Sequence, residues 1–318
     1  MKFLHTSDIH YGATPDANKP WGRERAQAIK AAFENIISVC ASEEINLLLI
    51  AGDLFDSIPT DQEIEEVNKA FASIPDTKVV VIPGKNDEIF AVSSVLLYKW
   101  AENVKYVTEN NGQYIDENLG ILMTVKNGSE IENPEKYVYI ALGGNHKPSA
   151  LLEGRMANSG SPEPVTSADT SKHGYYIGEI DEAEKKMRSL KFITLPTVRY
   201  ISLVVNVTPE TTNLEVVDNI KHELERRGAD NIYRLRLKGM CSPEAEFDLS
   251  GIKTNFKVID IIDQTEPKYD YASLFAEHSD DMVGFFIREM NKGDKTEMQQ
   301  KALAYGINAL LKTTDERK

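Results

Sequence analysis

The chain has few cysteines, no long apolar run and no excess of basic side chains, and each absence argues against a class of protein. Its two cysteines, Cys40 and Cys241, are far apart in sequence, which argues against a disulfide framework and a structural zinc site. No apolar segment approaches the roughly 20 residues of a membrane-spanning helix. The N-terminal residues turn polar too early for a secretory signal. We therefore expect a cytoplasmic protein without membrane contacts.

The formal net charge of −14 limits how the chain can contact nucleic acid. Binding to duplex DNA is driven largely by lysine and arginine side chains that replace counterions on the phosphates. A chain of this charge needs a local basic patch or a basic partner. One candidate patch is Arg234, Arg236 and Lys238, which alternate with apolar residues and so share one face of a predicted strand. A plainer interpretation is the solvated face of a half-buried sheet.

The N-terminal half alternates between strand-like and helical patterns. Apolar residues recur at helical spacing over residues 26–40, and a capping-box sequence, Thr60 to Glu63, opens a second helical pattern. Residues 95–100 are typical of a further helix. Repeated units of this kind, with near-continuous apolar strands, predict a sheet buried on both faces and hence a layered α/β fold.

The second half predicts a small domain and a helical tail. Residues 153–172 are rich in glycine, proline, serine and threonine, which indicates a loop. A helix face that includes Leu214 lies among strand patterns and indicates a small α+β unit. Two amphipathic helices follow, and they need either their own domain or a partner to pack on. We predict domains at 1–199 and 200–268 and a tail at 269–318.

Four strand-like stretches each end in a cluster of polar residues able to bind metal. The clusters are Asp8-Ile9-His10, Gly52-Asp53-Leu54-Phe55-Asp56, Gly84-Lys85-Asn86-Asp87 and Gly143-Gly144-Asn145-His146. Parallel strands place their carboxyl ends at one edge of the sheet, where α/β folds hold ligands. Carboxylates and imidazoles that converge there suit two divalent ions, which can clamp the attacking and leaving oxygens of a phosphodiester.

This ordered set resembles the calcineurin-like phosphoesterases. Further motifs are similar to the SbcD/Mre11 branch, the nuclease subunit of the DNA double-strand-break processing complex. They are the opening Leu4-His5-Thr6-Ser7-Asp8-Ile9-His10, the pair Lys147-Pro148 after His146, and Gly160-Ser161-Pro162-Glu163 followed by His173-Gly174. The resemblance covers nearly the whole chain and implies a metallophosphoesterase domain, a small capping domain and a C-terminal helical segment.

The departures from the family pattern are as informative as the match. The family's third motif is Gly-Asn-His-Asp, but here Lys85 and Asn86 stand in place of its Asn and His. The family's fifth motif is Gly-His-x-His, and Gly144 replaces its first histidine. The short span from 88 to 142 contains no histidine, so the family's intermediate His-Gly ligand is also missing. Asn86 becomes the metal-ligating Asn only if the loop slips by one residue.

The losses fall on one of the family's two metal ions. The resemblance implies that the first ion is held by Asp8, His10, Asp53 and His146, all of which are present. Asp53 alone remains of the second set, so we expect one divalent metal and no second ion. Ligands of this type suit manganese, and also iron or zinc. The alternative is a polar cluster held by hydrogen bonds without an ion.

The remaining motif residues have other predicted roles. Lys85 is a candidate charge substitute at the lost second ion, or else an exposed loop lysine. Asn86 and Asp87 occupy the positions of the family's catalytic His-Asp pair. Asp56 and Asp87 are expected to orient ligands or cap loops. We interpret His5 as a packed core histidine, and His173 as a loop residue.

The resemblance also implies partners. The tail would bind an SbcC/Rad50-like ATPase, the small domain would guide DNA ends, and helices of the first domain would form a homodimer. Three functions compete on these grounds: a subunit of a DNA-processing complex whose nuclease activity is impaired or lost, an active exonuclease or endonuclease with a rearranged site, and a small-molecule phosphoesterase. The clustered loss of ligands favours the first of these functions.

Overall fold

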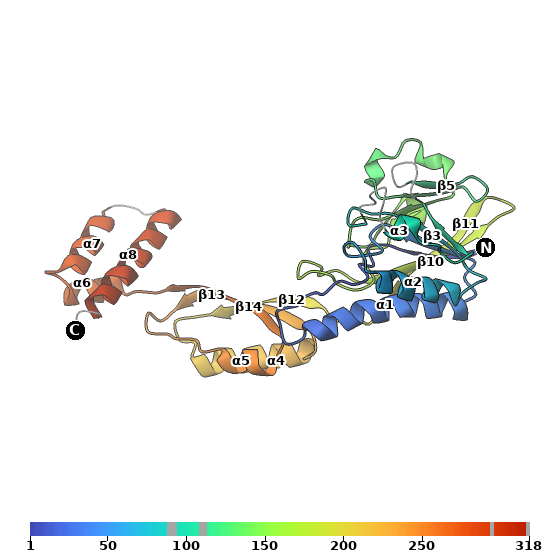
Figure 1. Ribbon diagram of the computed structural model, residues 1–318. Coiled ribbons are helices and arrows are strands. Elements are labelled where there is room, and N and C mark those ends of the chain that lie inside the picture. The colour runs from blue at the N-terminus through green and yellow to red at the C-terminus, as the bar shows by residue number, and fades with distance from the viewer. Residues whose placement is uncertain (88–93, 108–112, 293–295, 316–318) are drawn as a thin grey trace. The chain divides into compact units, whose positions relative to one another are not determined.

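The computed structural model describes residues 1–87, 94–107, 113–292 and 296–315. It divides into two compact units, Met1–Tyr200 and Ile201–Lys318, which are described separately (Figure 1). No helix within the described ranges is long and apolar enough to span a membrane.

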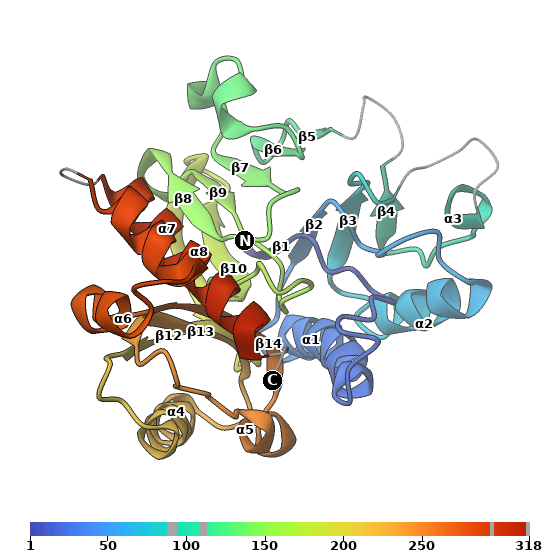
Figure 2. The same cartoon turned by 90° about the vertical axis from the view of Figure 1, so that its left-hand side faces the viewer.

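The first unit is built on a six-stranded mixed sheet in the order β11-β10-β1-β2-β3-β4. Its strands are β1 (Lys2–Thr6), β2 (Leu47–Ala51), β3 (Lys78–Ile82), β4 (Val104–Tyr106), β10 (Gly174–Asp181) and β11 (Lys186–Thr194). Strands β1 to β4 are parallel, and β10 pairs antiparallel with β1. Figure 2 shows β1, β2 and β3 side by side. This arrangement brings the carboxyl ends of three motif-bearing strands to one edge.

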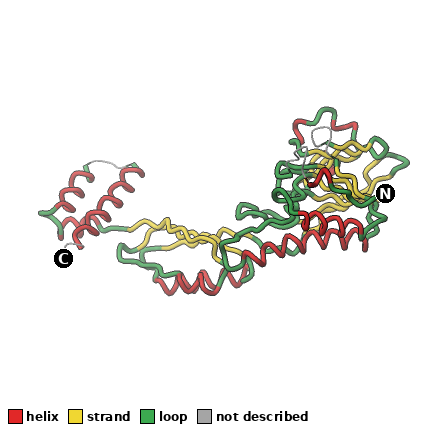
Figure 3. The backbone as a smooth tube through the Cα atoms, viewed as in Figure 1, coloured by secondary structure: helices red, strands yellow, loops and turns green. Residues whose placement is uncertain are grey.

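The two faces of this sheet are covered by different layers. Helices α1 (Gly22–Ser42) and α2 (Asp61–Ala72) pack on one face, where Phe33 and Phe71 contact strand residues such as Val79; Figure 3 shows both helices beside the strands. The other face packs on a second sheet through residues such as Leu49 and Tyr139. The predicted burial of both faces is confirmed, with a sheet in place of helices on the second face.

The second sheet has the order β5-β6-β7-β9-β8. Its strands are β5 (Tyr114–Asp116), β6 (Ile121–Thr124), β7 (Tyr139–Leu142), β8 (Ser149–Leu151) and β9 (Met156–Asn158). Strand β9 lies inside the segment that composition predicts to be a loop, so that prediction is wrong in part. It pairs with β7 and β8, and such long-range pairing outweighs the local preference for a turn.

The second unit has a three-stranded sheet in the order β12-β13-β14. Its elements are β12 (Tyr200–Val207), α4 (Asn213–Arg227), β13 (Ile232–Cys241), α5 (Ser250–Asn255) and β14 (Val258–Pro267), followed by α6 (Tyr271–Glu277), α7 (Met282–Met290) and α8 (Glu297–Asp315). Buried residues of α4, such as Ile220, share a core with Leu235 and Leu237 of β13. The tail helices form their own core, in which Val283 and Ile287 meet Leu303 and Ile307.

Local expectations have mixed outcomes. The capping box is confirmed, because Thr60 Oγ1 accepts from the Glu63 amide and the Glu63 carboxylate accepts from the Thr60 amide. The helix expected over 95–100 is shorter: α3 covers Ser94–Leu97, and Trp100 instead stacks on Tyr106. The side chain of Leu214 is 69% exposed, so the buried face of α4 excludes it. The sequence prediction also missed α6.

Candidate metal centre

The first two motifs meet through their backbones at the carboxyl edge of the main sheet. The amide of Asp8 donates to Gly52 O at 3.0 Å, and the amide of His10 donates to Asp53 O at 3.0 Å. Asp8, His10 and Asp53 all have positive φ angles, of 49°, 52° and 42°. Such backbone is costly for residues other than glycine and concentrates at functional sites. The folded chain therefore holds these three side chains in strained but defined positions.

The four predicted ligands of the first ion lie together. Asp8, His10 and His146 each offer a ligand atom, and these atoms lie within 4.8 Å of one another. Asp53 Oδ2 lies 3.9 Å from His10 Nε2. Asp8, His10 and Asp53 are buried and His146 is half-buried. The structure thus brings together residues that are up to 138 positions apart, which spans Asp8 to His146 in the sequence.

Each imidazole has a carboxylate on its Nδ1 atom. His10 Nδ1 lies 3.1 Å from Asp56 Oδ1, and His146 Nδ1 lies 3.0 Å from Asp169 Oδ2. The two Nε2 atoms face each other at 3.1 Å. With both Nδ1 atoms donating, the facing Nε2 atoms present two lone pairs, and only a cation between them, a proton or a metal ion, makes this separation favourable. The donor set therefore fits a divalent metal held by His10, His146, Asp8 and Asp53.

The electrostatics of the site depend on burial and on these pairs. Burial raises the pKa of Asp8, against a hydrogen bond with Ser7 and the nearby histidines. The hydrogen bond with Asp169 raises the pKa of His146. Burial opposes ionisation of Asp169, but bonds from His146 and the Thr166 amide lower its pKa to about 2. Asp169 is therefore ionised at neutral pH and can anchor the His146 imidazole.

Hydrogen-bond donors of two motif loops contact the carboxylates of Asp53 and Asp8. The Asn86 amide donates to Asp53 Oδ1 at 2.8 Å, and Asn86 Nδ2 donates to Asp53 Oδ2 at 3.3 Å. The Gly144 amide lies 3.1 and 3.2 Å from the two carboxylate oxygens of Asp8. Asn86 is thus placed beside Asp53 as a donor. Lys85 is exposed and forms no ion pair with any described residue.

Asp87 holds the motif loops together. Its carboxylate accepts from the amides of Leu54 and Phe55, both at 2.9 Å, and from Gly84 at 3.1 Å. Burial raises the pKa of Asp87 to about 6 despite these bonds. This geometry agrees with a loop-capping role, and Asp56 has the expected orienting contact with His10.

The other sequence candidates lie elsewhere. His5 is fully buried between Tyr139 Oη at 2.8 Å and Leu142 O at 3.1 Å, which confirms a packed core histidine. The basic set Arg234, Arg236 and Lys238 belongs to β13 in the second unit. Arg234 and Arg236 are half-buried, and Lys238 is exposed, so the expected alternation with buried apolar residues is confirmed.

Sequence reasoning missed Asp169 and the buried pair Arg25–Glu163. Arg25 of α1 is 1% exposed, and its Nη1 donates to Glu163 while its Nη2 donates to Pro164 O at 2.7 Å. Glu163 belongs to a motif that carried the family resemblance, which was the available signal. Asp169 lies in a stretch of small polar residues and gave no signal of its own.

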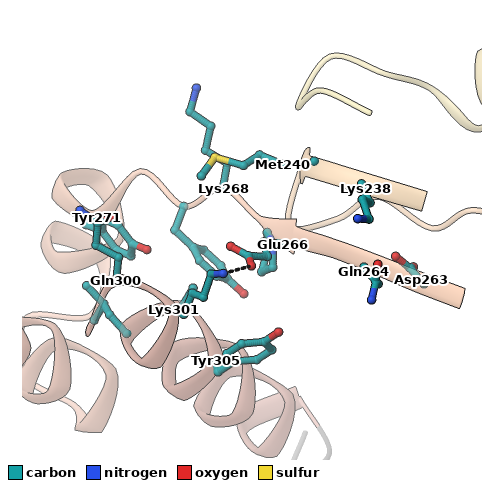
Figure 4. Close-up of a pocket in the computed structure, with 15 residues that line it drawn as sticks. Lys238, Met240, Asp263, Gln264, Glu266, Lys268, Tyr271, Gln300, Lys301 and Tyr305 are labelled. Atoms are coloured by element: carbon teal, nitrogen blue, oxygen red, sulfur yellow. Dashed lines mark ion pairs between the residues drawn. The ribbon is translucent and has the colours of Figure 1, made fainter. Parts of the chain in front are cut away.

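Two cavities in the described residues are notable. One, of about 670 Å³, adjoins the candidate site and is lined by residues 144–147 and 168–171. The other, of about 960 Å³, lies in the second unit between the ends of β13 and β14 and helix α8. Figure 4 shows Lys301 of α8 turned toward Glu266 in this second cavity, at 3.5 Å. The first cavity has both His146 and Asp169 in its lining.

Comparison with known families agrees with this geometry. The family model described as calcineurin-like phosphoesterase matches residues 1–235, which is more than half of the chain. The match includes the strand ends that carry Asp8, His10, Asp53 and His146. Its members typically bind divalent metals, as the donor set here would. On this evidence the chain belongs to the calcineurin-like phosphoesterase family.

Proposed function

We propose that this chain is an SbcD/Mre11-like subunit of a DNA double-strand-break processing complex, with at most one metal ion and with impaired or lost nuclease activity. The proposal is carried mainly by the hydrogen bonds that Asn86 donates to both oxygens of the Asp53 carboxylate. Asp53 is the one carboxylate that the resemblance assigns to both ions, so these donors would compete with a second ion for its oxygens.

Asn86 saturates Asp53 on the side where a bridging carboxylate would meet the second ion. Both oxygens of Asp53 accept from this one residue. Gly84 keeps the loop against Asp53, because a Cβ at Gly84 would collide with the Asp53 carboxylate and amide. A second ion would therefore have to displace Asn86, with neither of the family's imidazole ligands to compensate.

The fifth motif is altered in the same sense. Gly144 has a φ of +77°, a conformation that a histidine at this position would adopt only with strain. At Gly143 a Cβ would collide with Ala51 O, so this segment is held tightly against β2. Gly144 thus offers the site only its backbone amide, which donates to Asp8, and no side-chain ligand.

The predicted kinetic cost is large. Loss of a general acid typically lowers the rate by on the order of 10² to 10⁴. Loss of an electrostatic stabiliser costs on the order of 10² to 10³ more. Together these losses bring hydrolysis close to background, and leave binding or regulation as the main role of the chain.

Partners would contact the second unit and α3. The tail helices present exposed apolar side chains, among them Met282, Phe285 and Met298, after their own core is formed. Such a face suits the helices of an SbcC/Rad50-like ATPase. The half-buried Arg234 and Arg236 suit phosphates of DNA ends, and the 74% exposed Leu97 suits a homodimer contact.

A working nuclease with a rearranged site is the second candidate function. It is favoured by the four candidate metal ligands, which still lie close together. A phosphoesterase for small molecules is a third, and the cavity beside His146 suits it. Tight association with an SbcC-like ATPase would separate both DNA-related functions from the third.

Metal content and DNA hydrolysis test the proposal together. Manganese-saturated protein is expected to hold at most one ion per chain by elemental analysis, and two ions would contradict the proposal. Nucleotide release from duplex ends is expected to be equal and near background in the wild type and in His10→Ala. His222→Ala is the control, because His222 is exposed on α4. Activity that vanishes only in His10→Ala would establish the working nuclease instead.

A further inference from the structure

The loop between β9 and β10 presents Asp169 to the candidate ligand His146. The Asp169 Oδ2 atom accepts from the amides of Val165 at 3.0 Å and Thr166 at 2.8 Å, and from Thr166 Oγ1 at 3.2 Å. The same oxygen lies 3.0 Å from His146 Nδ1. Local donors of the loop thus fix the carboxylate independently of the histidine. Because this oxygen is the acceptor for two backbone amides, the facing Nδ1 is the atom that must carry the proton of the contact.

A buried ion pair fastens this loop to α1. Arg25 and Glu163 are 1% and 4% exposed, and they bond directly. Arg25 also donates to Pro164 O at 2.7 Å, and its guanidinium lies 5.6 Å from the Tyr200 ring centre. A buried charge pair of this kind is disrupted at a large cost when one partner is removed. It therefore holds the start of the loop in one place.

Further bonds connect the loop to itself and to His146. His173 Nδ1 lies 3.0 Å from Ser161 O, and His173 Nε2 lies 3.4 Å from Asp169 O. The Ser161 amide donates to His146 O at 3.3 Å. His173 is 1% exposed, so these bonds are shielded from water. Asp169 and the backbone of His146 are thereby parts of one continuous network.

We propose that Asp169 is a positioning residue that holds His146 as the Nδ1–H tautomer and leaves Nε2 free toward His10. The Arg25–Glu163 pair supports it by fixing the loop. The part that concerns metal affinity rests on the proposed function. The tautomer does not, because it follows from the hydrogen bonds of the chain alone.

Replacement of Asp169 should weaken metal binding at His146. Loss of the group that orients a ligating histidine typically lowers metal affinity by about 10-fold to 100-fold. Asp169→Ala is the sharpest change, since it removes the oxygen that faces His146 Nδ1. The lone pair of His10 Nε2, 3.1 Å from His146 Nε2, is then the remaining acceptor and favours the Nε2–H tautomer.

The experiment is ¹⁵N NMR of the histidine side chains in metal-free protein, followed by manganese titration. The His146 signal is assigned by its loss in His146→Gln. Asp181→Ala is a matched control, because Asp181 also accepts from turn amides and pairs with a basic side chain. It lies at the opposite end of the sheet, since the neighbouring Glu179 pairs with Lys2 at the start of β1.

The expected result is an Nδ1–H imidazole at His146 in the wild type and in Asp181→Ala. Asp169→Ala should give the Nε2–H form and weaken manganese binding about 10-fold to 100-fold. An Nε2–H imidazole in the wild type would overturn the inference, even if the variant fails to fold. An unchanged tautomer and unchanged affinity in Asp169→Ala would also overturn it. If the wild type takes up no manganese, the part of the inference that concerns metal affinity fails, while the tautomer shift in the variant still supports the positioning role.

Discussion

The buried histidine His5 makes the stability of the first unit depend on pH. It is fully buried, and burial lowers its pKa to about 3, against the hydrogen bond with Leu142 O. Its neutral form suits the site, because Nε2–H donates to Leu142 O while Nδ1 accepts from Tyr139 Oη. Protonation would remove that acceptor and place a charge in the core.

The sign and size follow from proton linkage. An unfolded histidine titrates near pH 6.5, so below that pH the unfolded chain binds a proton that the folded chain does not, and stability falls. From this one group the loss is about 1.4 kcal/mol at pH 5.5 and about 2.7 kcal/mol at pH 4.5, relative to pH 8. These values barely depend on the folded pKa, because His5 is still neutral at pH 4.5.

The assay is urea unfolding of wild type and His5→Gln over this pH range, with chelator present. The variant is expected to be less stable at pH 8 but to lose less stability on acidification, by about 2.7 kcal/mol at pH 4.5. Other groups, such as His173, are present in both proteins. Their contributions therefore cancel in the difference between the unfolding free energies of wild type and His5→Gln. His222→Gln, at an exposed position, should follow the wild type. Parallel curves for wild type and His5→Gln would refute the reasoning.

Two further predictions concern packing. Gly143→Ala should destabilise the first unit by more than about 3 kcal/mol in thermal unfolding, since its Cβ would collide with Ala51 O. In the control Gly251→Ala, in α5, the added Cβ meets nothing within 4 Å, and the variant should gain about 0.5–1 kcal/mol of stability. Equal melting shifts would contradict this. Arg25→Met should cost about 3–5 kcal/mol by leaving Glu163 charged and buried, and the added change Glu163→Gln should restore part of it; no recovery would argue against the ion pair.

Much of the fold and half of the centre follow from local sequence pattern. The apolar run at β2 and the spacing along α1 and α2 predict the elements, because one periodicity buries one face. The parallel order of strands then predicts that Asp8 and Asp53 meet at one edge. A strand-like stretch that ends in residues able to bind metal can be recognised from neighbouring positions in the sequence alone.

The sequence by itself determined the layered α/β architecture and the identity of the four candidate ligands. Only the tertiary structure decided which groups bond to those ligands: the Asn86 side chain and the Gly144 amide on the two carboxylates, and Asp169 behind His146. The reason is that a hydrogen bond depends on atoms within about 3 Å of each other. Asp169 and His146 come from separate loops, and no periodicity in the sequence reports that the fold brings them into contact.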